Sequence, residues 1–157
     1  MDVSLEEQGE VAEDFLAGLV EAFGLRATIS ATMLDDETLE LSLDGEDLNL
    51  LIGARGMTLQ AIQDLTRTVV QRQTKASYGR LLVDVLGYRK KRRVALERFA
   101  RQLADEVRTA GSRRALEPMS ASDRKVVHDV VNTLDGVTTT SEGEEPNRRV
   151  VILPADS

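Results

Sequence analysis

Two glycines three residues apart interrupt an apolar, helix-forming run over residues 50–62. Because glycine weakens a helix interior, Gly53 and Gly56 predict a tight turn between two helices. Without side chains there, a large ligand can approach the backbone, and Arg55 adds a permanent charge at the tip. The helix that follows starts with free amides and a positive dipole end, which attract phosphate. The run therefore favours a clamp for a phosphate-bearing ligand, although an ordinary helix–turn–helix corner can show the same spacing.

The formal net charge of −7 argues against a polyanionic ligand until its distribution is considered. Residues 1–47 contain 14 acids and one base, whereas residues 55–125 contain 17 bases and 7 acids, a net charge of +10. An acidic front thus precedes a basic body, the footprint expected of a nucleic-acid-binding chain. The acidic front either screens the basic body from unwanted nucleic acid or docks another protein.

Composition excludes several other functions. The chain has no cysteine and one histidine, so disulfides, a thiol nucleophile, a cysteine zinc site and a histidine-rich metal site are ruled out. Aromatic residues make up only 3% of the chain, so base stacking is not expected as the main binding mode. No signal peptide or long apolar run is present. We expect a cytoplasmic protein that inserts in no membrane, uses no cofactor and is not an enzyme.

The first half of the chain has the pattern of a small α+β domain. Apolar residues at helical spacing predict helices, and alternating apolar and polar residues predict strands. Gly24 and Asp44-Gly45 mark turns. The expected order is a helix over 11–23, a half-buried strand over 25–33, a strand over 39–43, short and long helices over 46–52 and 57–75, and a buried strand over 80–86.

The second half begins with the longest predicted helix, residues 88–110, which opens with five consecutive bases. A basic run at a helix start opposes the helix dipole, so an acidic ligand, an acidic neighbour or plain solvation must offset it. An extended piece over 113–118 and a helix from Ser120 to about Leu134 follow, then strands over 137–140 and 148–153. In that last helix Arg124 and His128 are four residues apart, on a face expected to look outward.

Further sequence surrounds the Arg-x-x-x-His pair. Pro118-Met119 precedes it, the run from Thr140 to Ile152 follows it, and Val83-Asp84-Val85-Leu86 leads into Gly87-Tyr88-Arg89 upstream. With the Gly-x-x-Gly turn, this combination closely resembles the Jag family, also called SpoIIIJ-associated proteins, over roughly residues 10–154. The resemblance implies a disordered acidic tail (1–9), a type II KH domain with helices on one face of a three-stranded sheet (10–87), and a small α/β Arg-x-x-x-His domain that binds single-stranded nucleic acid (88–157).

The resemblance also implies a function, namely bacterial RNA binding linked to gene regulation and to the cell envelope or division. The expected partners are single-stranded RNA or single-stranded DNA, and a second KH-domain protein. A non-catalytic adaptor with incidental nucleic-acid affinity is the alternative. Many family members carry an additional N-terminal domain and a long linker, which this chain does not show. The predicted contact residues are Ile52, Gly53, Ala54, Arg55, Gly56, Leu59, Arg113, Arg114, Arg124, Lys125, His128 and Arg148.

Overall fold

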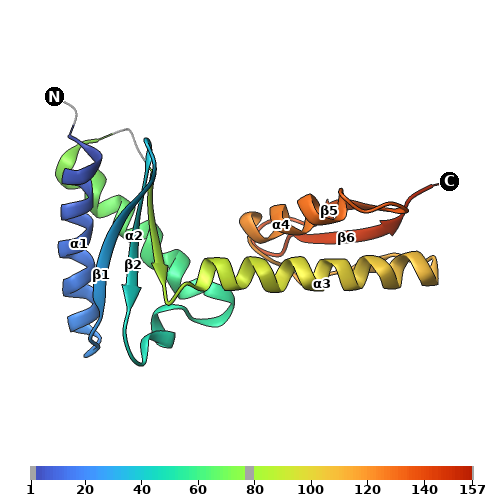
Figure 1. Ribbon diagram of the computed structural model, residues 1–157, viewed down its shortest axis with the longest axis horizontal. Coiled ribbons are helices and arrows are strands. Elements are labelled where there is room, and N and C mark those ends of the chain that lie inside the picture. The colour runs from blue at the N-terminus through green and yellow to red at the C-terminus, as the bar shows by residue number, and fades with distance from the viewer. Residues whose placement is uncertain (1–2, 77–79, 157) are drawn as a thin grey trace. The chain divides into compact units, whose positions relative to one another are not determined.

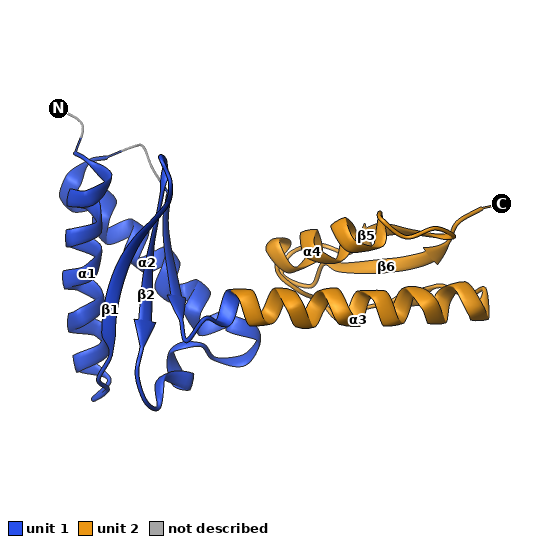
Figure 2. Ribbon diagram, viewed as in Figure 1, with its two compact units in different colours: residues 1–89 blue, residues 90–157 orange. Residues whose placement is uncertain are grey.

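The computed structural model describes residues 3–76 and 80–156. The chain divides into two compact units, residues 1–89 and residues 90–157 (Figure 2). The first unit has a three-stranded sheet in the order β1-β2-β3, and the second has one in the order β4-β6-β5. Helices accompany both sheets (Figure 1), so the predicted α+β class is confirmed.

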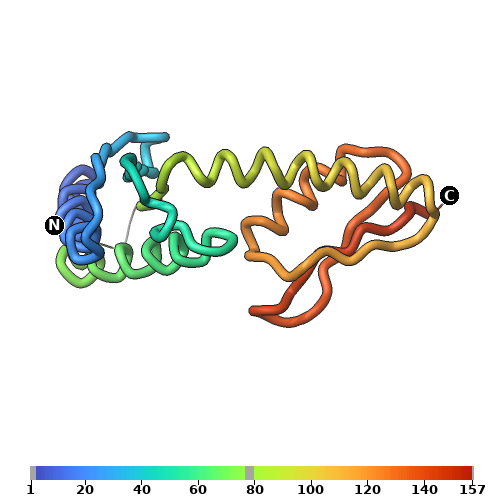
Figure 3. The backbone as a smooth tube through the Cα atoms, turned by 90° about the horizontal axis from the view of Figure 1, so that it is seen from below, coloured from blue at the N-terminus to red at the C-terminus, as the bar shows by residue number. Residues whose placement is uncertain are grey.

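In the first unit, β1 (Thr28–Asp35) runs antiparallel to β2 (Thr38–Asp44), which runs parallel to β3 (Arg80–Val85). Two helices, α1 (Leu5–Ala22) and α2 (Met57–Thr74), lie side by side on one face of this sheet (Figures 1 and 3). Short 3₁₀ turns, η1 (Leu48–Leu51) and η2 (Ala54–Gly56), connect β2 to α2. The buried core includes Leu16, Leu41, Leu43, Leu48, Leu51, Val83 and Val85.

Two predictions for this unit are wrong. Disorder was expected up to residue 9, but α1 starts at Leu5 because Ser4 and Glu7 form a reciprocal capping box. Residues 1–2 of the predicted tail lie outside the described residues. Half-burial was expected along the first strand, but Ala31 and Met33 of β1 are exposed, since β1 is an edge strand that extends beyond the helices.

The outer edge of β3 is closed by a side chain from α2. The buried Gln63 side chain donates from Nε2 to the Leu81 carbonyl at 2.5 Å and accepts the Val83 amide at 2.6 Å. Its Oε1 also accepts a hydrogen bond from the Arg89 guanidinium at 3.0 Å. The side chain therefore takes the place of a neighbouring strand along these two residues and satisfies backbone groups that would otherwise be buried without partners.

The second unit contains most of α3 (Tyr88–Ala110), a single uninterrupted helix with the predicted bounds (Figure 3). It also contains β4 (Arg114–Ala115), α4 (Ala121–Val131), β5 (Val137–Glu142) and β6 (Arg149–Pro154). Its three strands pair antiparallel. A second buried core joins α3 to α4 and the sheet, through Leu96, Ala100, Leu103, Val107, Val127, Val131, Val150 and Ile152.

Two searches of the described residues gave negative results. None of their helices combines the length and the apolarity needed to cross a bilayer. They also contain no group of three or more His, Cys, Asp or Glu side chains placed to hold a metal ion.

Candidate nucleic-acid interface

The Gly-x-x-Gly turn joins η1 to α2, and its two glycines adopt backbone angles that other residues avoid. Gly53 has φ 72° and ψ −178°, a region essentially restricted to glycine. Gly56 has φ 73°. A Cβ on Gly53 would overlap the Thr58 side chain, and one on Gly56 would lie 2.5 Å from Cε1 of Tyr88. Both positions therefore require glycine for the turn itself, before any ligand is considered.

The residues between and beside the glycines are open to solvent. Ala54 and Arg55 are exposed, and Arg55 holds a left-handed conformation with φ 55°. Met57, directly after the turn, is 69% exposed, and Leu50 before it is 60% exposed. The tip of the turn thus presents a cation between two accessible apolar side chains.

Two expectations for this site need correction. Leu59 was predicted to line a groove for bases, but it is 2% exposed and packs in the core, whereas Ile52 is half-buried at its margin. The amides at the start of α2 were expected to face a ligand, yet Met57 donates to the Ala54 carbonyl and Leu59 donates to the Ile52 carbonyl at 3.1 Å. The charge of Arg55 is therefore the main attraction for phosphate here.

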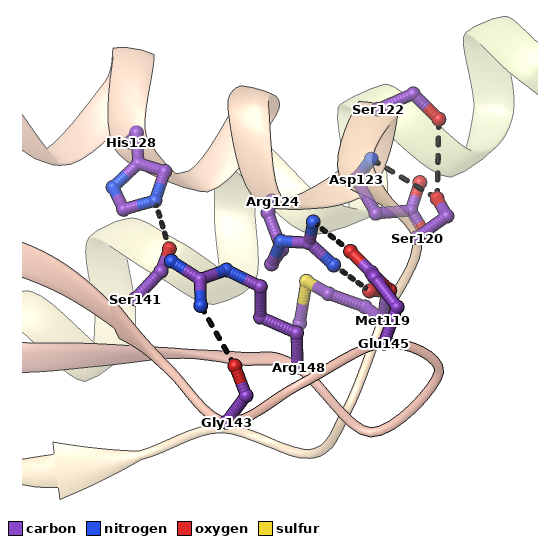
Figure 4. A network of polar contacts seen from close by, with 10 residues as sticks. All are labelled: Met119, Ser120, Ser122, Asp123, Arg124, His128, Ser141, Gly143, Glu145 and Arg148. Atoms are coloured by element: carbon purple, nitrogen blue, oxygen red, sulfur yellow. Dashed lines mark hydrogen bonds and ion pairs between the residues drawn. The ribbon is translucent and has the colours of Figure 1, made fainter.

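Arg124 does not look outward as predicted. Its side chain is only 10% exposed and donates to the Met119 carbonyl at 2.7 Å and to the Glu145 carboxylate at 2.5 Å (Figure 4). It turns inward because the loop between β5 and β6 folds back over the start of α4 and brings Glu145 to it. Arg124 thus ties that loop to the helix, which is a role in shaping the site.

His128 lies between α4 and β5 with both ring nitrogens engaged. Nδ1 lies 2.7 Å from the Thr139 hydroxyl, and Nε2 lies 2.8 Å from the Ser141 hydroxyl. Partial burial lowers the pKa of His128, and the nearby Arg124 and Arg148 cations lower it further, while Asp129 opposes them. The imidazole is therefore mainly neutral at pH 7, with one nitrogen donating and the other accepting.

Arg148 completes this second cluster. It donates to the Gly143 carbonyl at 2.7 Å, and its guanidinium points toward the side chains of Ser141 and His128 (Figure 4). Arg124 is on α4 and Arg148 precedes β6, and the two come near each other because the loop between β5 and β6 lies against α4. The cluster offers a partly exposed cation, a neutral imidazole and a hydroxyl, groups that suit phosphate oxygens and base edges.

The remaining predicted cations are ion-paired within the protein. Arg113 pairs with Glu142 at 2.9 Å, Arg114 with Glu106 at 3.1 Å, and Lys125 with Asp129 at 2.5 Å. These pairs are exposed, so each contributes little to stability and can exchange for another anion. The structure does not bring Arg113 and Arg114 into the cluster of Arg124, His128 and Arg148 by any hydrogen bond it records.

Three contributors to the two sites were not predicted. Ser141 and Thr139 fix the imidazole, and the only signal for them was a run of hydroxyl residues on a predicted strand beside the histidine. Glu145 fixes Arg124, and nothing in its acidic loop distinguished it from Glu144. Tyr88 packs on Gly56, although 32 positions separate them in the sequence.

A Gly-x-x-Gly turn on a three-stranded sheet, followed by an Arg-x-x-x-His helix on a second sheet, defines a chain that joins a KH domain to an Arg-x-x-x-His domain. Residues 9–83 match the family described as KhpA/KhpB, KH domain, and residues 94–154 match the family of Arg-x-x-x-His domains. The RNA-binding protein KhpB of Bacillus subtilis is 36% identical over 146 residues, which cover 90% of this chain and 68% of that protein. The chain belongs to the KhpB family, and the resemblance to Jag proteins is confirmed.

Two other relatives carry the same name. RNA-binding protein KhpB of Clostridium symbiosum is 34% identical over 142 residues, which cover 90% of this chain and 64% of the relative. That of Lactiplantibacillus plantarum is 34% identical over 139 residues, which cover 88% of this chain and 42% of the relative. The chain therefore spans between about two fifths and two thirds of the length of these curated relatives.

Proposed function

We propose that this chain binds single-stranded RNA without catalysing a reaction on it. The observation that carries the proposal is the Gly-x-x-Gly turn, whose backbone only glycine permits and whose tip exposes Arg55 beside Met57. Such a turn clamps the sugar–phosphate backbone of about four nucleotides in KH domains. The relatives' name, RNA-binding protein KhpB, supports the same assignment.

The second contact site is the cluster on α4, β5 and the loop between β5 and β6. Here Arg148 and His128 contact phosphate or base edges, with the Ser141 hydroxyl beside them. Arg124 acts through the loop that it holds rather than by direct contact. Lys125, Arg113 and Arg114 add weaker contacts, because an RNA phosphate must compete with the acid that each already pairs.

The turn is best tested at Arg55, since any side chain at Gly53 or Gly56 would collide with Thr58 or Tyr88 and disturb the fold. Asn tolerates the left-handed backbone of Arg55, so Arg55→Asn removes the charge and keeps the turn. We expect this variant to weaken filter binding to a single-stranded RNA pool about tenfold, a loss of about 1.4 kcal/mol. A parallel titration with single-stranded DNA of the same sequences measures the preference between the two.

A matched control lies at the other end of α2. Lys75 is an exposed cation with the same φ of 55°, and it lies outside the turn. Lys75→Asn should leave RNA affinity within twofold of the unaltered chain at equal ionic strength. An Arg55→Asn variant that binds as well as the control would rule out the turn as the clamp. An unaltered chain that binds no RNA at moderate salt would support the adaptor function instead.

Two finer proposals follow from the same family. A second KH-domain protein is a candidate partner, supported by the KH family description, which spans both KhpA and KhpB. A regulatory role linked to the cell envelope or division is proposed from the Jag resemblance. Crosslinking followed by sequencing of the bound transcripts tests that role, because regulation of the envelope requires envelope or division transcripts among the targets.

A further inference from the structure

The basic residues of the second unit separate into two sets by their partners. Seven form ion pairs with acids, namely Arg92, Arg108, Arg113, Arg114, Arg124, Lys125 and Arg149, and Arg148 donates to a carbonyl. Within the part of the chain that the structure describes, the other five form no side-chain hydrogen bond or ion pair, and all five are on α3: Lys90, Lys91, Arg93, Arg98 and Arg101. The unpaired charge of this unit is therefore concentrated on one helix.

Three of these cations share one face of α3. At about 100° per residue, Lys91, Arg98 and Arg101 fall within an arc of about 80°, and we call them the α3 stripe. The stripe lies opposite the face that buries Leu96 and Val107. All three residues are exposed. Figure 1 shows α4, β5 and β6 together on the other side of α3, so the rest of the unit leaves this face uncovered.

We propose that the α3 stripe is a third RNA contact of this chain and binds successive phosphates of a single strand. The inference rests on the proposed RNA-binding function and adds a surface that neither the Gly-x-x-Gly turn nor the Arg-x-x-x-His cluster includes. At 1.5 Å per residue, Lys91 and Arg101 are about 15 Å apart along the helix, enough for more than one phosphate. Unpaired cations exchange only counterions for phosphates, whereas paired ones must first release an acid.

The chemistry of the stripe favours a nucleic acid over an acidic protein. Protein interfaces need an apolar centre that excludes water around their charges. The stripe contains one exposed apolar residue, Val94, and the exposed Phe99 lies about 80° beyond its nearest member, Lys91. An extended row of charge without an apolar centre suits a polyanionic backbone, to which it binds without reading sequence.

The experiment measures RNA affinity against salt concentration for three versions of the full chain. The stripe variant combines Lys91→Gln, Arg98→Gln and Arg101→Gln. The control variant loses the same charge elsewhere in the unit, through Arg93→Gln, Arg108→Gln and Arg149→Gln. The rescue variant exchanges the cations, as Lys91→Arg, Arg98→Lys and Arg101→Lys. Gln keeps helix propensity, and circular dichroism melts confirm that each variant is folded.

The stripe variant should lose about 2 units from the slope of log affinity against log salt, since each single-strand phosphate contact contributes about 0.7. Its affinity at 0.1 M salt should fall roughly 10- to 100-fold, while the control changes less than threefold and the rescue variant keeps the parental slope. A stripe variant with the parental slope overturns the proposal and leaves the surface to another partner, such as an acidic protein. The Arg55→Asn result is separate, so a stripe without effect leaves the proposed function standing, whereas an unaltered chain that binds no RNA overturns both.

Discussion

At the scale of single residues, the two members of the Arg-x-x-x-His motif have different roles. Arg124 is nearly buried and holds the Met119 carbonyl and Glu145, whereas Arg148, which is not part of the motif, points toward His128 from a more exposed position. The residue that the motif names is therefore a positioning residue, and a residue outside the motif offers its charge to a ligand.

This division predicts different losses for two arginine substitutions. Arg124→Ala should lower the free energy of unfolding by about 1.5–3 kcal/mol, because it removes two hydrogen bonds donated by a nearly buried cation. It should also weaken RNA binding. Arg148→Ala should weaken binding by a similar factor with less than about 0.5 kcal/mol of lost stability. Urea unfolding and filter binding on both variants test this. Equal stability losses would contradict the assignment.

The sequence predicted that Arg124 and His128 belong together but could not predict which way each points. Periodicity placed both beyond the apolar stripe of α4, and that face is solvent-exposed only if no loop covers it. The loop between β5 and β6 covers Arg124 through Glu145, and β5 supplies the hydroxyls that hold His128. These contacts are between residues 11 to 21 positions apart, which a local pattern does not encode.

At the scale of elements, the edge of β3 depends on a residue that periodicity counts as misplaced. Gln63 lies on the buried face of α2 among Leu59, Ile62 and Val70, where an apolar residue would be expected. Its two backbone contacts explain the exception, because the edge of β3 that faces α2 has no strand beside it.

We predict that Gln63→Leu, which is close in volume and more apolar, destabilises the first unit by about 2–4 kcal/mol. Burial would improve, but the Val83 amide and the Leu81 carbonyl would lose their partner in a buried setting. Gln60→Leu is the matched control, since Gln60 is exposed and contacts only the Asp64 side chain. Its effect should stay within about 0.5 kcal/mol. Denaturant unfolding compares them, and a stabilised Gln63→Leu variant would refute the edge-closing role.

Element type was predictable because each element has a clear period and a marked end. Helix α3 has the predicted bounds, and the glycine turn falls where two glycines break an apolar run. The errors fall where tertiary context decides. The alternation in β1 predicted half-burial along the whole strand, but the helices cover only part of it. The start of α1 was missed because its capping box lies in an acidic segment that resembles a disordered tail.

At the scale of the whole molecule, the net charge of −7 conceals an uneven division. Residues 1–89 carry 16 acids and 7 bases, and residues 90–157 carry 11 acids and 13 bases. The first unit is acidic in sum although the exposed tip of its turn is cationic, so long-range attraction to RNA must come mainly from the second unit. A strand drawn to the second unit can then engage Arg55 as an intramolecular step.

Two sites on one chain predict an affinity that depends on RNA length. An oligonucleotide of about four nucleotides fits one KH-type site, so Arg55→Asn should weaken its binding at most twofold if the other unit binds it comparably. A longer strand engages both units, and such linkage can raise affinity by about 10² to 10⁴. The same substitution should then cost the longer strand its full tenfold. Titration of unstructured oligonucleotides of increasing length, with Lys75→Asn as control, measures the ratio. A loss that is equal at every length would mean that the two units bind RNA independently.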